Sequence, residues 1–329
     1  GGAELFLTAM GTPQDIMPQA VLYLRVYMVG MVPVVMYNLL SGVIRALGDS
    51  RNPMIFQCVG GVLNIVGDYV CIAVLGMGVE GTAVATVISQ AVAACCATVY
   101  LIWLRTPYAL HLSQPGLHIR ELSNVLRVGV PAGIQSIVIT FSNILIQSQI
   151  NTLGVTSIAA FTVYFRTEMV LYLPILAIGQ AVVSFVGQNY GAGKPGRIRQ
   201  SNQICILGGS LVIFAAGGLL MLAAPGYLHI FTKDAAVIAE TADIIRITFP
   251  LYFLYVILEV LSGNLRGYGK AVAPMIVTVV SFCGFRIVFM LAAMSLHPSV
   301  QSVAFSYPAS WAMAVILMTV TMRYLKRRN

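Results

Sequence analysis

Long apolar runs dominate the chain, and short polar or charged segments separate them. An α-helix needs about 20 apolar residues to cross the hydrocarbon core of a bilayer, and these runs are long enough. They are continuous, and they lack the alternation of apolar and polar positions that a membrane β-barrel shows. The pattern therefore predicts nine membrane-spanning helices, at residues 17–46, 53–76, 81–104, 129–153, 157–187, 203–224, 239–265, 273–295 and 301–323.

The composition also indicates an all-α polytopic membrane protein. Of the 329 residues, 58% are hydrophobic and only 9% are charged, and the mean hydropathy is +0.87. A soluble domain carries about 25% charged residues, so this chain has too few charges to cover a water-facing surface. The six cysteines are scattered, mostly in apolar runs, without the spacing of metal ligands. We therefore expect packing thiols and no metal site.

The basic residues indicate the orientation of the chain. When successive loops are assigned alternately to the two sides of the membrane, fourteen Lys and Arg residues fall on one side and Lys233 alone on the other. Cytoplasmic loops carry an excess of Lys and Arg. We therefore expect the C-terminus in the cytoplasm and residue 1 outside. The net charge of +8 then reflects topology and does not indicate a nucleic-acid partner.

The segment at 106–128 is the longest polar stretch of the chain. Ile119, Leu122 and Val125 fall near one helical face within it. This pattern predicts a short amphipathic helix in the membrane interface. The segment is also the natural linker between two repeats.

A stretch of fourteen residues occurs twice, at an offset of 221 residues. Residues 41–54 read SGVIRALGDSRNPM and residues 262–275 read SGNLRGYGKAVAPM, with six identical positions. Each copy is typical of a turn between two helices, because Gly48 and Gly269 can take a positive φ and end a helix. A proline at the same place in each copy suits the first turn of the next helix.

This repeat predicts the organisation of the whole protein. Residues 9–104 match the region 230–325, and three further spans lie between them. Their counterparts in the first copy would precede residue 1, so we expect twelve spans in the intact protein, of which this chain supplies the last nine. We assign 1–113 to the second half of an N-terminal lobe and 114–329 to a six-helix C-terminal lobe. An even number of spans per repeat predicts lobes related by a pseudo-twofold axis along the membrane normal.

Polar residues inside the predicted spans are candidates for function, because charges at bilayer depth are costly. Asn64 and Asp68 are four residues apart and share one helical face. Asp68 has no basic residue three or four positions away. It is either a site for a coupling cation or proton, or a structural hydrogen-bonding residue.

The fourth predicted span carries a stripe of amides: Gln135, Asn143, Gln147 and Asn151. Such a stripe avoids lipid, so it either forms hydrogen bonds between helices or lines a polar cavity.

Glu259 lies deep in the seventh span, near Tyr252 and Tyr255 on a neighbouring face. An acid beside aromatic rings suits an organic cation, although Arg286 is an equally good candidate to neutralise it. Glu168 is two residues from Arg166 and faces another direction, so these two residues are not an obvious pair.

The sequence contains no recognisable set of catalytic residues. It has no phosphate-binding loop of the Walker type, and its four histidines lie unclustered near loops. We expect no enzymatic activity and no cofactor.

Four motifs, in this order, resemble the multidrug and toxic compound extrusion (MATE) family: IRALGDSRNP, NIVGDY, GVEGTAVATVISQ and GQNYGAGK. The resemblance covers nearly the whole chain but about the last three quarters of the family's length. It implies two six-helix lobes and the export of amphipathic organic cations in exchange for H⁺ or Na⁺. It also implies a cation site in the N-terminal lobe, at Tyr23, Asn64, Asp68 and Thr86.

Two departures from the family pattern bear on coupling. The first-helix aspartate of that cation site would lie before residue 1. The acid that another branch carries in the fourth span would fall at Ile139, which is apolar. The pattern is therefore most similar to bacterial branches of the cytoplasmic membrane whose cation site is in the N-terminal lobe.

We therefore expect a monomeric, secondary active multidrug antiporter that alternates access between its two lobes. Its coupling ion is H⁺ or Na⁺, and Na⁺ at Asp68 is the only metal expected. The candidate substrate cavity is formed by Asn143, Gln147, Glu259 and Tyr255.

Two alternatives stay open. One is a lipid-linked oligosaccharide flippase of the same superfamily, although such flippases line the cavity with many basic residues and only Arg166 and Arg286 lie near mid-span here. The other is an inactive fragment.

Overall fold

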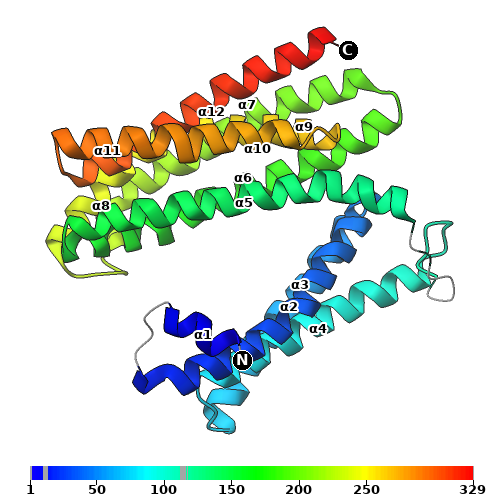
Figure 1. The fold of residues 1–329 in the computed structure, drawn as a ribbon, viewed down its shortest axis with the longest axis horizontal. Helices are drawn as coiled ribbons and strands as arrows, with labels where there is room; N and C mark the ends of the chain where they lie inside the picture. Colours follow the sequence, from blue (N-terminus) through cyan, green and yellow to red (C-terminus); the bar gives the residue numbers. More distant parts are fainter. Residues whose placement is uncertain (1, 10–13, 112–115, 117, 329) are drawn as a thin grey trace. The chain divides into compact units, whose positions relative to one another are not determined.

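The computed structural model describes residues 2–9, 14–111, 116 and 118–328, which form helices joined by short turns (Figure 1). These described residues contain no β-strand. In the described part of the chain, eight helices are long and apolar enough to cross a membrane, and one bent pair, taken as a single span, brings the count to nine. The prediction of an all-α fold with nine spans is thus confirmed. The chain divides into two compact units, residues 1–116 and 117–329.

Unit 1 consists of three long helices and a short N-terminal one (Figure 1). Its elements are α1 (Gly2–Ala9), a 3₁₀ turn (Gln14–Ile16), α2 (Met17–Ala46), α3 (Arg51–Tyr69) with a π-helical end (Val70–Val74), and α4 (Val79–Trp103). Both α2 and α3 pack on α4. Small residues permit this packing, because a Cβ added at Gly60 would lie 3.3 Å from Ser89 O and from the methyl group of Ala93.

The two copies of the repeated turn have the same backbone conformation. Gly48 has φ +95° and Gly269 has φ +75°, so the predicted role of these glycines is confirmed. In both copies the glycine N–H bonds to the carbonyl three residues earlier, and the next N–H bonds to the carbonyl five residues earlier, over 2.9–3.2 Å. These bonds satisfy carbonyls that the end of a helix leaves free.

The side chains that follow this turn differ between the copies. In the first copy, Asp49 Oδ1 accepts from the backbone N–H groups of Arg51 and Asn52, at 3.0 and 3.1 Å. Its Oδ2 accepts from the side chains of Asn52 and Tyr100, both at 2.6 Å. The side-chain hydrogen bonds from Asn52 and Tyr100 lower the pKa of Asp49 to about 2. Lys270 stands at this place in the second copy, so the hydrogen bonds that Asp49 accepts are not repeated there.

Unit 2 is a bundle of long helices in which α6 and α9 share the core (Figure 1). Its elements are α5 (Ile119–Thr152), α6 (Val155–Gly191), α7 (Pro195–Leu228), α8 (Ala235–Thr248), a 3₁₀ turn (Phe249–Leu251), α9 (Phe253–Gly267), α10 (Val272–Thr278), a π-helical segment (Val279–Phe285), α11 (Arg286–Leu296) and α12 (Val300–Arg328).

Two details of unit 2 differ from the sequence prediction. In the described part of 106–128, the expected separate interfacial helix is not present, because α5 begins at Ile119 and continues through Pro131. At about 50 Å this helix is longer than the hydrocarbon core, so its first turns still suit the interface. The predicted span 239–265 bends by 48°. Pro250 lies at the bend and has no N–H to continue the helix.

Glycines bring α6 and α9 into backbone contact. Gly263 and Gly267 are four residues apart on α9 and face α6. A Cβ at Gly263 would lie 2.8 Å from the carbonyl oxygen of Gly179, and one at Gly267 would lie 2.7 Å from Val186 Cβ. Small residues at this spacing are typical of close helix packing in membranes.

We predict that Gly263→Ala destabilises unit 2, since the new methyl group meets backbone atoms that cannot rotate away. Overpacking of this kind costs about 1–3 kcal/mol. The matched control is Gly208→Ala in α7, where no atom lies within 4 Å of the added Cβ. The control should be as stable as the parent or more stable. Thermal unfolding in detergent measures both, and equal melting temperatures would contradict the packing argument.

Candidate functional site

A polar, aromatic pocket of about 390 Å³ opens within unit 2. It lies where α5, α6, α9, α11 and α12 approach one another. Its lining residues are Ile139, Asn143, Gln147, Phe165, Glu168, Met169, Tyr172, Tyr252, Tyr255, Phe282, Arg286, Tyr307 and Trp311. The pocket thus combines one acid, one base, two amides and a group of rings.

Glu168 is the one acid that lines this pocket. Its Oε1 accepts hydrogen bonds from the hydroxyl groups of Tyr252 and Tyr164. Both tyrosines are almost fully buried. Among the described residues, no basic side chain forms a salt bridge with Glu168. The carboxylate is therefore held by neutral donors, and its charge is not cancelled by direct contact.

Arg286 is the one base that lines this pocket, and it is 2% exposed. Its Nε donates to Ser310 Oγ at 2.7 Å. Its guanidinium lies 4.0 Å from the ring centroid of Phe282 and 5.0 Å from that of Tyr307. Ring faces attract a cation most strongly where water is excluded. The rings and the hydroxyl group therefore stabilise this charge without a carboxylate.

The aromatic side of the pocket is a continuous cluster of five rings: Tyr172, Tyr252, Tyr255, Tyr307 and Trp311. Tyr172 stacks on Tyr255 with ring centroids 5.8 Å apart. Trp311 lies 5.7 Å from Tyr255. Such a cluster offers ring faces and edges to a flat apolar ligand.

The predicted amide stripe divides into two parts. Asn143 and Gln147 line the pocket, and Gln147 Nε2 donates to Asn151 Oδ1 at 3.0 Å. Gln135 is buried and donates to Thr278 Oγ1 at 3.0 Å, which joins α5 to α10. Both alternatives for the stripe thus occur, on different turns of one helix.

Glu259 is placed away from the other predicted cavity residues. Tyr255 lines the aromatic pocket, whereas Glu259 does not. Its carboxylate forms a salt bridge with Arg266 at 3.0 Å, so Arg266 neutralises Glu259 and the alternative pairing with Arg286 is wrong. Arg266 lies about two turns further along the same helix. Gly179 on α6 has no side chain and leaves space for the Glu259 carboxylate.

The predicted cation-site residues lie in unit 1, on α2, α3 and α4. Asn64 Nδ2 donates to Thr86 Oγ1 at 3.1 Å, so the structure brings these two together. Asp68 is half-buried on the same helix as Asn64, and its Oδ1 is buried without a hydrogen-bond partner in the described part of the chain. The ring of Tyr23 stacks on Tyr27 at 6.0 Å.

Glu168 and Trp311 line the pocket but were not among the cavity residues predicted from the sequence. A signal for Glu168 was present, since Tyr164 and Tyr172 are four residues away on either side and share its helical face. No comparable sequence pattern indicates the contact between Glu168 and Tyr252, which are 84 residues apart in the chain.

Comparison with known proteins gives a consistent result. The family model described as MatE matches residues 2–70 and 131–292. A probable multidrug resistance protein of Bacillus subtilis, YpnP, is 29% identical over 288 residues, 87% of this chain and 64% of that protein. The probable multidrug resistance protein NorM of Thermotoga maritima is 28% identical over 273 residues, 80% of this chain and 58% of that protein. The chain thus spans less than two thirds of the length of these relatives.

Solved structures have the same fold. A crystal structure of MATE in complex with MaL6 matches with a TM-score of 0.91 and 23% identity, covering 99% of this chain and 74% of that one. An outward-facing multidrug resistance MATE family transporter matches with a TM-score of 0.88 and 23% identity, covering 99% and 72%. At this level of identity, the match concerns the fold alone.

We predict that Glu259→Gln destabilises unit 2 strongly. The Glu259 and Arg266 side chains are only 10% and 18% exposed, and removing one partner of a buried pair costs about 3–5 kcal/mol. The exposed pair Asp243–Arg246, at 42% and 66%, is the matched control. Asp243→Asn should cost at most about 1 kcal/mol. Melting temperatures of the two variants test this, and similar losses would argue against a buried ion pair.

Proposed function

The chain belongs to the MatE family, and on this basis we propose that the protein is a secondary active transporter that exports amphipathic organic cations. The membership confirms the resemblance that the sequence motifs indicated. The aromatic pocket with its single acid, Glu168, is the observation that carries the proposal. A transporter with this role is not an enzyme, and it needs no cofactor beyond its coupling ion.

The chemistry of the pocket supports a cationic, partly aromatic substrate. A cation near Glu168 would gain a charge–charge interaction beside tyrosines that are shielded from solvent. The apolar part of such a substrate would pack on Tyr172, Tyr255 and Trp311, which offer ring faces. Asn143 and Gln147 add hydrogen-bonding groups that fix orientation.

The single base in the pocket argues against the flippase alternative. A cavity for lipid-linked phosphates would offer several basic side chains to one ligand. Arg286 is the only one among the described lining residues. Its Nε is already bound to Ser310, and two rings lie close to the guanidinium.

For coupling we propose Asp68, with Asn64 and Thr86 as neutral ligands and Tyr23 as the fourth member that the family resemblance implies. A carboxylate at bilayer depth is poorly solvated, so it either holds a proton or binds a cation. The unpartnered Oδ1 of Asp68 and the Asn64–Thr86 hydrogen bond support this assignment. These residues suit H⁺ or Na⁺, because they offer several oxygen ligands of which only the Asp68 carboxylate carries a charge.

Coupling in this proposal is a shift between two states of the transporter. Occupancy of Asp68 by an ion can change their balance by no more than the difference in ion affinity between them. We further propose a monomer in the cytoplasmic membrane, with alternating access and the C-terminus inside. The Lys and Arg distribution supports this orientation.

The substrate assignment predicts that Glu168→Gln weakens the binding of an organic cation about tenfold or more, which corresponds to about 1.4 kcal/mol. Gln keeps an acceptor for Tyr252 and Tyr164 but loses the charge. Ethidium binding to the purified full-length protein, followed by fluorescence, is the measurement. Glu121→Gln, an exposed acid at the start of α5, is the control. Equal affinity in the two variants would refute a cation site at Glu168.

The coupling assignment predicts that Asp68→Asn abolishes gradient-driven efflux while the protein still folds. Asn keeps the shape and one acceptor but cannot titrate. Asn64→Ala and Thr86→Ala should weaken efflux less, since each removes a neutral ligand. Glu80→Gln, in the first turn of α4 in the same unit, is the control. The measurement is efflux from vesicles under an imposed H⁺ or Na⁺ gradient. Undiminished efflux by the Asp68→Asn variant would contradict the coupling assignment and leave Asp68 as a structural hydrogen-bonding residue.

A further inference from the structure

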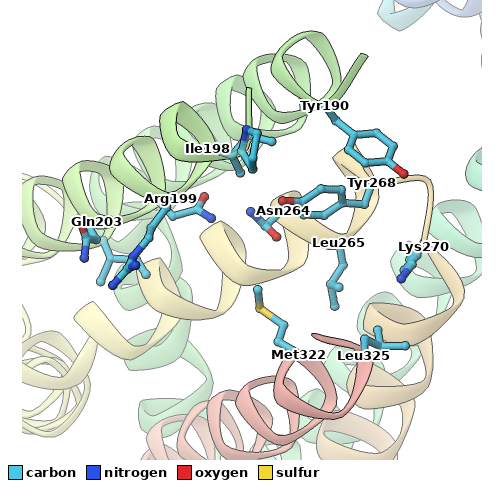
Figure 2. Close-up of a pocket in the computed structure, with 13 residues that line it drawn as sticks. Tyr190, Ile198, Arg199, Gln203, Asn264, Leu265, Tyr268, Lys270, Met322 and Leu325 are labelled. Carbon is cyan, nitrogen blue, oxygen red and sulfur yellow. The ribbon is translucent and has the colours of Figure 1, made fainter. Parts of the chain in front are cut away.

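A second pocket lies at the end of unit 2 where α6, α9 and α12 finish and α7 begins (Figure 2). It encloses about 500 Å³ and shares no lining residue with the aromatic pocket. Its apolar wall is formed by Ile198, Leu265, Met322 and Leu325 (Figure 2). The proposed transport function makes no use of this pocket.

A buried amide without partners lies at the centre of this pocket. Asn264 is 1% exposed, and neither its Nδ2 nor its Oδ1 forms a hydrogen bond with any described residue. Asn202 Oδ1, on α7, lines the same pocket, and it too is buried and forms no hydrogen bond with a described residue. Buried polar groups are nearly always paired, because an unpaired one is costly. These atoms therefore indicate a ligand with both acceptor and donor groups.

Two basic side chains lie on either side of this amide. Figure 2 shows Arg199 on one side of Asn264 and Lys270 on the other, with Tyr268 beside the amide. Neither basic residue forms a salt bridge with a described acid. Two free cations around one small pocket are suited to a phosphate group.

The pocket lies at the basic end of unit 2, which the distribution of Lys and Arg assigns to the cytoplasmic surface. Tyr190 and Tyr268 meet edge to face at its rim, with ring centroids 5.0 Å apart. Tyrosines are enriched at this depth, where lipid headgroups lie. The apolar wall can then contact acyl chains while the polar groups face the headgroup.

We propose that this pocket binds a phosphate ester that carries free hydroxyl groups, supplied either by the headgroup of phosphatidylglycerol or by a soluble glycerol phosphate. Arg199 and Lys270, on either side of the amide, attract the phosphate by their charge. Asn264 Nδ2 donates to an ester or phosphate oxygen. The ligand hydroxyls donate to Asn264 Oδ1 and Asn202 Oδ1, which a phosphate alone could not satisfy.

The first copy of the repeat lacks these groups although it has the same turn. Val43 stands at the place of Asn264, and Asp49 at the place of Lys270. The Asp49 carboxylate is already bound by Asn52 and Tyr100. The pocket is therefore a property of the side chains in the second copy and does not follow from the turn itself.

The experiment titrates the purified full-length protein with short-chain phosphatidylglycerol and, separately, with sn-glycerol 3-phosphate. Binding is followed by the ligand-induced rise in melting temperature. Phosphatidylcholine, which has no free hydroxyl group, is the lipid control. We expect the double variant Arg199→Gln/Lys270→Gln to bind at least about tenfold more weakly. The matched double variant Lys194→Gln/Arg323→Gln removes the same charges outside the pocket and should bind within about twofold of the parent.

A second variant separates ligand binding from packing. Asn264→Leu removes both unpartnered atoms at similar volume, so the unliganded protein should melt at a higher temperature. Its response to phosphatidylglycerol should be lost. A response to the lipid alone identifies a lipid site, and a response to glycerol phosphate as well identifies a headgroup site open to water. The proposal is overturned if neither probe binds, if the two double variants weaken binding equally, or if Asn264→Leu retains the response.

Discussion

The backbone contact between α6 and α9 is the constraint on which the rest of unit 2 depends. Gly263 lies against the carbonyl group of Gly179 with no room for a methyl group. In a membrane, apolar side chains gain little by leaving lipid, so close packing supplies much of the association energy. Because the two helices are held at this distance, Tyr252 reaches Glu168, and the Glu259 carboxylate is enclosed beside α6.

The interior charges of unit 2 are stabilised in two different ways. Glu259 and Arg266 neutralise each other directly, so they stabilise the bundle and offer little to a ligand. Glu168 and Arg286 are held by hydroxyl groups and rings. Their charges are therefore not cancelled by contact with an opposite charge, and both line the same pocket. The difference explains why one acid is suited to structure and the other to binding.

The sequence predicted the helices well because long apolar runs have only one stable form in lipid. The predicted span 17–46 coincides with α2, and the bend at Pro250 could have been inferred from the missing N–H. The contacts between helices could not be predicted in the same way. Whether Glu168 meets Tyr252 depends on how far each helix is rotated about its axis. Hydropathy is nearly uniform around α6 and does not fix its rotation. Glu259 and Arg266, by contrast, are seven residues apart on α9 and share one face of that helix.

The π-helical segment Val279–Phe285 has a consequence for how the pocket can change in evolution. A π turn contains one more residue than an α turn, so it rotates everything that follows by about 100° relative to an uninterrupted helix. Arg286 is the first residue after this segment. Its inward direction therefore depends on the number of preceding residues as well as on its own identity. Loss of a single codon in this segment would turn the guanidinium away and alter the charge of the pocket without replacing any amino acid.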